Sequence, residues 1–169
     1  EAKARGIKPI IGCEVYIAPR SMTDRQPHTD SNYAHLVLLA KDQKGYLNLV
    51  KLVSMGFIDG FYYKPRIDYE VLSQHSEGLI GLSACLAGDI PRLLLSGQKK
   101  DAQALALRLE KIMGKGNFYL ELQDHGLEEQ ARVNPLIAEL SKATGIPLIA
   151  TNDVHYVNSE DATAHDVLI

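Results

Sequence analysis

The sequence predicts an α/β fold whose strands are mainly parallel, arranged as a sheet or a barrel. Short apolar runs typical of buried strands alternate with longer segments whose apolar residues recur at helical spacing. Several residues suited to metal binding follow directly after the apolar runs, and in such folds ligands gather at the carboxyl ends of strands. A chain of 169 residues is long enough for one domain with a hydrophobic core.

Five apolar runs predict the strands, near residues 9–17, 36–40, 79–83, 118–122 and 147–151. Turn-forming or polar residues flank these runs, as is usual for buried strands. Residues 18–33 are polar and contain Pro19 and Pro27, so they predict a loop between the first two strands. Residues 56–66 predict a second loop, rich in aromatic side chains.

The helical segments carry capping residues. Asp42 precedes an apolar stripe at i, i+3, i+4 and i+7, and Asp68 precedes a short helix, so both are expected to be N-caps. Residues 100–113 and 128–144 predict two longer helices, the second kinked or restarted at Pro135 and followed by Gly145. The stripe after Asp42 consists of Tyr46, Leu49, Val50 and Val53.

Both ends of the sequence resemble interrupted helices. Residues 1–5 are helix formers, and Gly6 follows at the position of a helix C-cap. Ser159 is placed to cap a last helix that continues through Ile169. We therefore expect residues 1–169 to be one domain fragment, which starts inside the domain and ends near its C-terminal boundary.

Composition excludes several classes of protein. The net charge of -3 gives no basic surface for nucleic acid, so any DNA would be held by other parts of a larger protein. No apolar run approaches the roughly 18 residues of a membrane helix, and the first residues lack the apolar stretch of a signal peptide. Cys13 and Cys85 make no disulfide framework, which favours a reducing, cytoplasmic location and no membrane partner.

The strongest chemical signal lies directly after the fifth strand. Asp153 and His155 are two residues apart, so in an extended chain they face the same side. A carboxylate beside an imidazole suits a divalent metal such as zinc or manganese. The alternative is that Asp153 caps a turn and His155 is an ordinary surface residue.

Three further residues are candidate metal ligands. Cys85 follows the third strand and is either a thiolate ligand or a small buried apolar residue. Glu14 interrupts an apolar strand, so its carboxylate needs a metal or a basic partner. His35 precedes the second strand and is either a ligand delivered by the preceding loop or a structural histidine. His125, after the fourth strand, is a candidate to support the ligands or a plain loop residue.

The aromatic stretch from Gly60 to Asp68 contains two cations, Lys64 and Arg66. A structural interpretation, in which the stretch packs against a neighbouring element, competes with contacts from Lys64 and Arg66 to a phosphate or nucleic acid. The acidic overall charge favours the structural interpretation.

Several long motifs, in order and in register, resemble the PHP (polymerase and histidinol phosphatase) domain of bacterial DNA polymerase III alpha subunits. The motifs are Gly12–Tyr16, His35–Ala40, Gly60–Asp68, Ser83–Leu86, Thr151–Tyr156 and His165–Leu168, and the resemblance covers the whole chain. It implies a PHP-type distorted (β/α)7 barrel with a metal site at the carboxyl ends of its strands.

The resemblance also implies the ligand set and the catalytic residues. The metal ligands would be Glu14, His35, Cys85, Asp153 and His155, of which Glu14, Asp153 and His155 also carry the catalysis. Cys85 stands where many relatives have a histidine. A His-x-His pair and an Asp-His-Gly motif would precede Glu1, so the chain is expected to be N-terminally truncated. As it stands, it should bind zinc or manganese weakly and hydrolyse no DNA at a useful rate.

The resemblance implies a role in DNA replication. The parent subunit would be a DNA-directed DNA polymerase, with magnesium at a polymerase site outside this chain, and the PHP region would use its metals for 3′–5′ exonuclease proofreading. Its partners would be DNA, held by the rest of the subunit, a separate proofreading exonuclease and the sliding clamp. The main alternative is a non-catalytic module that docks the separate exonuclease, and a free-standing phosphoesterase for a small phosphate ester is a third possibility.

Overall fold

The structure is a computed structural model that describes residues 1–168, in which six strands form one sheet in the order β3-β1-β2-β4-β5-β6. The β1–β3, β4–β5 and β5–β6 pairs are parallel, whereas β2 is antiparallel to both β1 and β4. The predicted α/β fold with mainly parallel strands is therefore confirmed. No closure into a barrel is seen in the described part of the chain, where β3 and β6 form the sheet edges. The strands are β1 (Gly12–Ile17), β2 (Ala34–Ala40), β3 (Arg66–Ile67), β4 (Leu79–Leu82), β5 (Phe118–Leu122) and β6 (Leu148–Ala150).

Strand β1 begins three residues later than the predicted run 9–17. Gly12 pairs with Leu39, and the Ala40 N–H donates to the Ile11 carbonyl oxygen, so residues before Ile11 lie beyond the end of β2. Ile10 has no strand to pack against and is exposed. Strand β3 was not predicted, because a run of two residues is too short to carry a strand pattern.

The helices agree with most of the predicted segments. They are α1 (Gln43–Ile58), α2 (Tyr69–Gln74), α3 (Asp89–Leu95), α4 (Lys99–Met113), α5 (Glu128–Thr144) and α6 (Ala162–Leu168), with 3₁₀ turns at Lys3–Arg5 and Ser159–Asp161. Asp42 accepts a hydrogen bond from the Gly45 N–H and Asp68 from the Val71 N–H, both at 2.8 Å. Gly145 takes a left-handed conformation after α5, which continues through Pro135 as one helix.

Two predicted details are wrong, and one falls partly outside the structure. The last helical segment is capped by Asn158, not Ser159, because Asn158 and Asp161 form a reciprocal capping box. The buried face of α1 centres on Leu49 and Leu52, whereas Tyr46 and Val50 of the predicted stripe are substantially exposed. The predicted end of the last helix at Ile169 lies outside the described residues.

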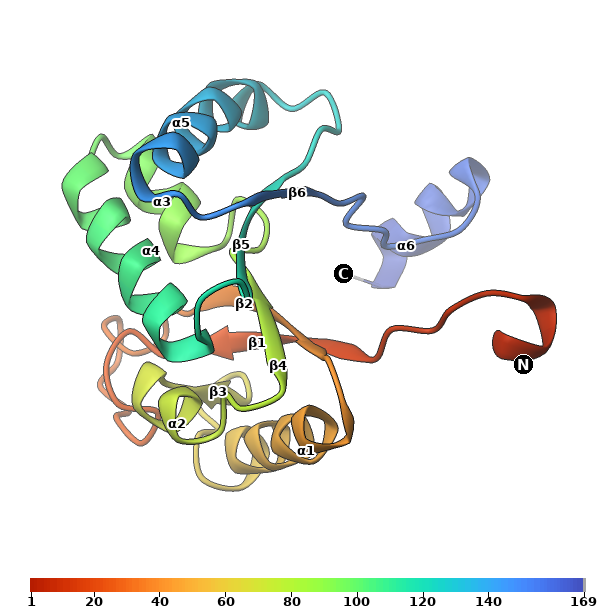
Figure 1. Cartoon of the computed structure of the whole chain (residues 1–169), viewed down its shortest axis with the longest axis horizontal. Helices are drawn as coiled ribbons and strands as arrows, with labels where there is room; N and C mark the ends of the chain where they lie inside the picture. The colour runs from red at the N-terminus through yellow and green to blue at the C-terminus, as the bar shows by residue number, and fades with distance from the viewer. Residues whose placement is uncertain (169) are drawn as a thin grey trace.

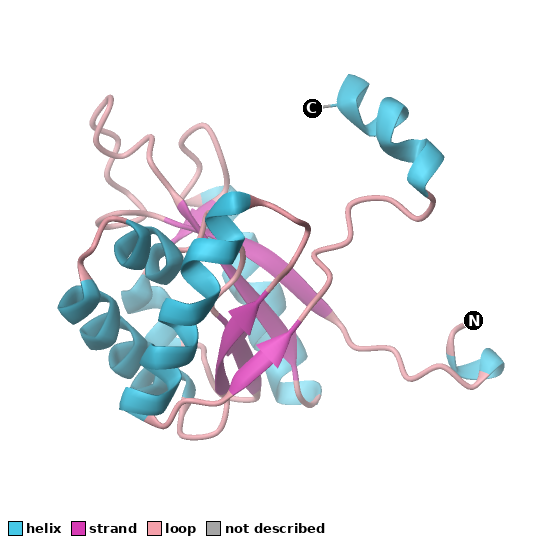
Figure 2. Ribbon diagram, turned by 90° about the horizontal axis from the view of Figure 1, so that it is seen from above, coloured by secondary structure: helices cyan, strands magenta, loops and turns pink. Residues whose placement is uncertain are grey.

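Figure 1 shows α3, α4 and α5 on one side of the sheet, while the N-terminal residues and α6 project away on the other side. Figure 2, seen from above, shows the same separation. Alternate residues of β1 and β2, such as Val15 and Leu36, are buried in the single core. The intervening residues, including Glu14 and His35, therefore face the opposite side of the sheet. No helix among residues 1–168 is long and apolar enough to cross a membrane.

Candidate metal centre

Glu14, His35 and Cys85 come together on the side of the sheet opposite the core. Their ligand atoms all lie within 4.8 Å of one another, and they are the only such group of three found in residues 1–168. Strand pairing places Tyr16 opposite His35, so Glu14 lies diagonally next to His35 on the same face. Because β2 is antiparallel to β1 and β4, its first residues lie at the edge of the sheet where β4 ends. Cys85 follows β4 at this edge.

The loop that carries Cys85 is fixed against the start of β2. The His35 N–H donates to the Ala87 carbonyl oxygen at 3.1 Å, and the Gly88 N–H donates to the Cys85 carbonyl oxygen at 2.9 Å. Ala84 is buried and adopts a left-handed conformation with φ 63°, which costs on the order of 1 kcal/mol for a residue with a Cβ. This turn redirects the chain after β4, and Cys85 Sγ lies 3.8 Å from His35 Nδ1.

His35 is the electrostatic centre of the group. Its hydrogen bonds with Cys85 and Glu14 raise the pKa of the imidazole from 6.5 to about 9, against the opposing effect of burial. The hydrogen bond with His35 lowers the pKa of Glu14, and the charge of His155 adds to this effect. In the absence of metal, His35 is therefore a cation at neutral pH, paired with the Glu14 carboxylate.

This donor set fits a divalent metal ion. One carboxylate oxygen, one imidazole nitrogen and one sulfur form the mixed N, O and S environment that zinc accepts, and the sulfur favours zinc over manganese. Three protein ligands leave a fourth position open, which is the arrangement of catalytic zinc sites. Glu14, His35 and Cys85 are each accessible to an ion, because none of the three is fully buried.

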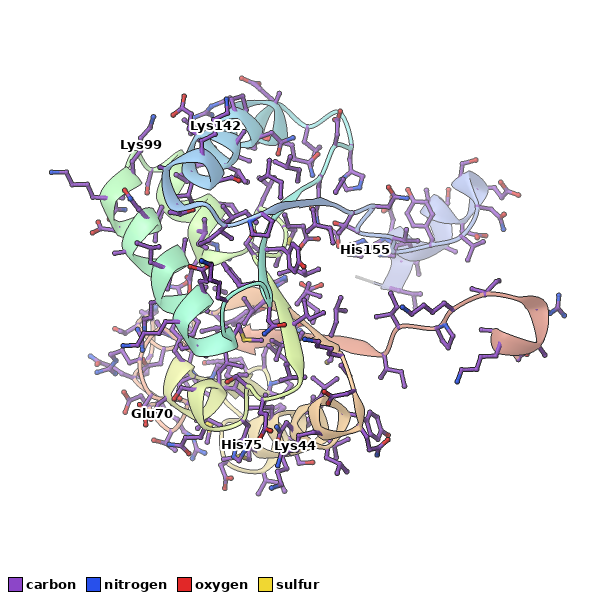
Figure 3. All side chains as sticks on the ribbon, in the orientation of Figure 1. Lys44, Glu70, His75, Lys99, Lys142 and His155 are labelled. Carbon is purple, nitrogen blue, oxygen red and sulfur yellow. The ribbon has the colours of Figure 1, made fainter. Side chains whose placement is uncertain are left out.

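Asp153 and His155 lie close to this group but do not join it. Both line a cleft of about 630 Å³, and Cys85 lines the same cleft. Asp153 takes a left-handed conformation with φ 45°, and His155 Nδ1 lies 2.8 Å from the Asp153 carbonyl oxygen. Figure 3 shows His155 on the segment between β6 and α6, with Lys99 and Lys142 on distant helices. The five predicted ligands are thus arranged as a group of three beside a pair.

His125 connects the loops after β5 and β6. Its Nε2 lies 2.7 Å from the Asn152 carbonyl oxygen, and Gln130 contacts both its Nδ1 and its backbone N–H. With the proton on Nε2, all these contacts are hydrogen bonds, so His125 fixes the residue before Asp153. Gln130 is buried and was not predicted, because a glutamine in the first turn of a helix carries no sign of burial in the sequence.

A buried polar network lies behind the cleft and was also missed. The Thr151 hydroxyl and the Gln123 amide both donate to Glu121 Oε1, and the Glu121 N–H donates to Ser83 Oγ at 2.8 Å. Among the described residues, Glu121 Oε2 and Gln123 Oε1 have no hydrogen-bond partner. A glutamate in a strand is the only sequence signal that could have pointed to this network.

Lys64 and Arg66 are placed differently from each other. Arg66 is completely buried, and its guanidinium donates to four backbone carbonyl oxygens at 2.6–3.2 Å. Arg66 therefore holds the 18–33 loop in place and is not accessible to a phosphate, which favours the structural interpretation. Lys64 is exposed, and its Nζ lies 5.7 Å from the centre of the Tyr16 ring. The four carbonyl oxygens that accept hydrogen bonds from Arg66 belong to Met22, Asp24, Asp30 and Gly60.

Comparison with known proteins places these residues in a sequence family. Residues 1–125 match the family model described as "PHP domain", a range that includes Glu14, His35 and Cys85 but not Asp153 or His155.

Three relatives are each named "DNA polymerase III subunit alpha". The protein from Treponema pallidum is 53% identical over 167 residues, covering 98% of this chain and 14% of the relative. The Borreliella burgdorferi protein is 49% identical over 170 residues, covering 100% of the chain and 15% of the relative. The Thermus aquaticus protein is 47% identical over 171 residues, covering 100% of the chain and 14% of the relative. The chain thus spans about one seventh of the length of these proteins.

Proposed function

The chain belongs to the PHP domain family, and on that premise we propose that it is a segment of a bacterial DNA polymerase III alpha subunit that carries a divalent-metal phosphodiesterase site. Residues 1–169 form one PHP-domain segment of that subunit, which works in the bacterial cytoplasm and synthesises DNA with magnesium at a separate site. The observation that carries the phosphodiesterase proposal is the gathering of Glu14, His35 and Cys85.

Each residue of the site has a role that follows from its position. Glu14, His35 and Cys85 would hold a zinc or manganese ion, which would supply Lewis acidity toward the phosphodiester. His155 has Nδ1 against the Asp153 carbonyl oxygen, so its Nε2 is available to take or return a proton at a substrate oxygen. Asp153 and His155 act from the wall of the cleft, and His125 positions their segment.

The substrate proposed for this site is the 3′ end of DNA, and the reaction is proofreading by 3′–5′ hydrolysis. A cleft of about 630 Å³ lies within the range of about 300–1,000 Å³ common for sites that enclose a ligand of nucleotide size. The chain has a net charge of -3, so the rest of the subunit holds the DNA. The separate exonuclease and the sliding clamp are the further partners of the subunit.

A second candidate function is a non-catalytic module that docks the separate exonuclease. The observation that favours it is the ion pair between His35 and Glu14, which satisfies both groups without a metal. Asp153 and His155 also stand apart from the group of three, so the full ligand set is not assembled in residues 1–168.

The test uses two substitutions in the full-length subunit and in this chain. Glu14→Gln and Asp153→Asn should both abolish zinc- or manganese-dependent removal of a 3′-terminal nucleotide while leaving nucleotide addition intact. The chain alone should bind zinc weakly by calorimetry and hydrolyse no DNA at a useful rate. Metal-dependent hydrolysis that survives both substitutions would place the activity elsewhere and favour the docking module.

A further inference from the structure

A second cavity lies on the other side of Glu14, between β1, α1 and the segment that leads into β3. It encloses about 230 Å³. The cavity exists because β3 pairs only with Tyr16 and Ile17, which leaves the first residues of β1 without a neighbour on this side. Gly56 of α1 faces the same space and has no side chain to fill it.

The lining of this cavity is apolar and partly aromatic. Tyr16, Phe57 and Pro65 contribute flat surfaces, and Glu14 is the only charged residue in the lining. Phe57 has 59% of its surface exposed, although a phenylalanine on a helix is normally turned toward the core. A cavity of about 230 Å³ is smaller than the usual ligand site of about 300–1,000 Å³, so it suits a single flat ring system.

Residues of the candidate metal centre line both this cavity and the larger cleft. Glu14 lines the small cavity, Cys85 lines the cleft, and His35 contacts both residues. A phosphate held at the group of three therefore has the apolar cavity on one side and the cleft on the other. Lys64, with its Nζ 5.7 Å from the Tyr16 ring, adds a cation beside the cavity.

We propose that the cavity lined by Tyr16, Phe57 and Pro65 binds the base of the 3′-terminal nucleotide whose phosphodiester lies at the metal centre. This inference rests on the proposed function and names the part of the substrate that the apolar cavity recognises. Bases of single strands stack on aromatic side chains whatever their sequence, and enzymes that act on nucleotides commonly draw the base into a fitted pocket. Phe57 and Tyr16 supply the stacking surfaces, and Lys64 approaches the neighbouring phosphate.

The experiment compares Phe57→Ala with Phe61→Ala in the full-length subunit supplied with zinc. Phe61 is a matched control, because it is 49% exposed, lies nearby in sequence and does not line the cavity. Fluorescence anisotropy measures binding of a short single-stranded DNA labelled at its 5′ end, with a phosphorothioate at the last linkage to prevent cleavage. A second DNA is identical except that its 3′-terminal nucleotide lacks a base.

Phe57→Ala should weaken binding of the intact DNA by about 5- to 150-fold, the equivalent of one stacked base, and leave binding of the abasic DNA unchanged. Phe61→Ala should change neither. Equal effects of Phe57→Ala on both DNAs, no effect on the intact DNA, or equal affinity of the unsubstituted subunit for the intact and the abasic DNA would overturn the proposal. Base-dependent binding without hydrolysis in the full-length subunit would contradict the proposed function alone.

Discussion

Binding of zinc should displace the proton that His35 carries in the metal-free chain. The imidazole has a pKa of about 9, so roughly 99% of the molecules hold this proton at pH 7. A histidine must be neutral to coordinate a metal, and the Cys85 thiol must also lose its proton. The protonation of His35 therefore lowers the apparent zinc affinity at pH 7 by about 100-fold relative to a neutral imidazole, whereas a histidine with a pKa of 6.5 would lower it less than about twofold.

Two measurements test this coupling. Proton NMR of the metal-free chain should show that His35 titrates near pH 9, and calorimetry in buffers of different ionisation enthalpy should show release of at least one proton per zinc at pH 7. Apparent affinity should still rise about tenfold between pH 7 and pH 8 because of His35 alone. Glu14→Gln should lower the pKa of His35. A His35 titration midpoint below pH 7 in the unsubstituted chain would refute the reasoning.

The ion pair of His35 with Glu14 also contributes to the pH dependence of stability in the metal-free chain. The raised pKa of His35 contributes stability that is fully present below pH 6.5 and is lost as the pH rises through about 9. The lowered pKa of Glu14 contributes stability that is present above its ordinary value of 4.5 and is lost as the pH falls. Urea unfolding should therefore give the largest contribution of this pair to the free energy of unfolding between about pH 5 and 6.5.

The remaining predictions concern stability and are measured by urea unfolding. Gly45→Ala should destabilise the chain by about 2–3 kcal/mol or more, because the alanine Cβ would overlap the Gly78 carbonyl oxygen. Gly56→Ala in the same helix should be tolerated, because a Cβ there meets nothing closer than 3.5 Å. Arg66→Lys should cost at least about 2 kcal/mol, since an ammonium cannot satisfy four carbonyl oxygens in this geometry, and an unchanged midpoint would contradict the role of Arg66. Glu121→Gln should stabilise by about 1 kcal/mol, because a neutral amide costs less to bury than a carboxylate of which one oxygen has no partner; destabilisation would indicate that a buried water or ion is bound there.

Most strands and helices could be predicted from the sequence, though not β3 and α3, and strand direction could not. An apolar run such as 36–40 has the same pattern whichever way it runs. The best available signal for an antiparallel pair was the 18–33 segment, because it contains no helix and a parallel crossover usually needs one. Without that helix the chain returns next to β1 in the opposite direction, which is the observed pairing.

The limits on predicting the site have a similar origin. Residues that follow apolar runs, such as Cys85 and Asp153, could be proposed as site residues because strand ends are visible in the sequence. Gln130 and Glu121 were missed, since nothing in an amphipathic pattern distinguishes a polar residue that faces solvent from one that faces a buried neighbour. Arg66 shows the converse, because a cation in an aromatic loop suggests a phosphate contact until its donors are found to be occupied by carbonyls.

The reversed direction of β2 explains why His35 can belong to a site built at strand ends. His35 is the second residue of β2, and in a purely parallel sheet it would lie at the edge opposite Cys85. Because β2 alone runs the other way, its amino end meets the carboxyl end of β4, and the two side chains come within 3.8 Å. Glu14, His35 and Cys85 therefore come from β1, from β2, which is paired on both sides, and from the turn after β4. Asp153 and His155 follow the edge strand β6, which has a pairing partner only in β5, so their segment is held by fewer strand pairs than His35 is.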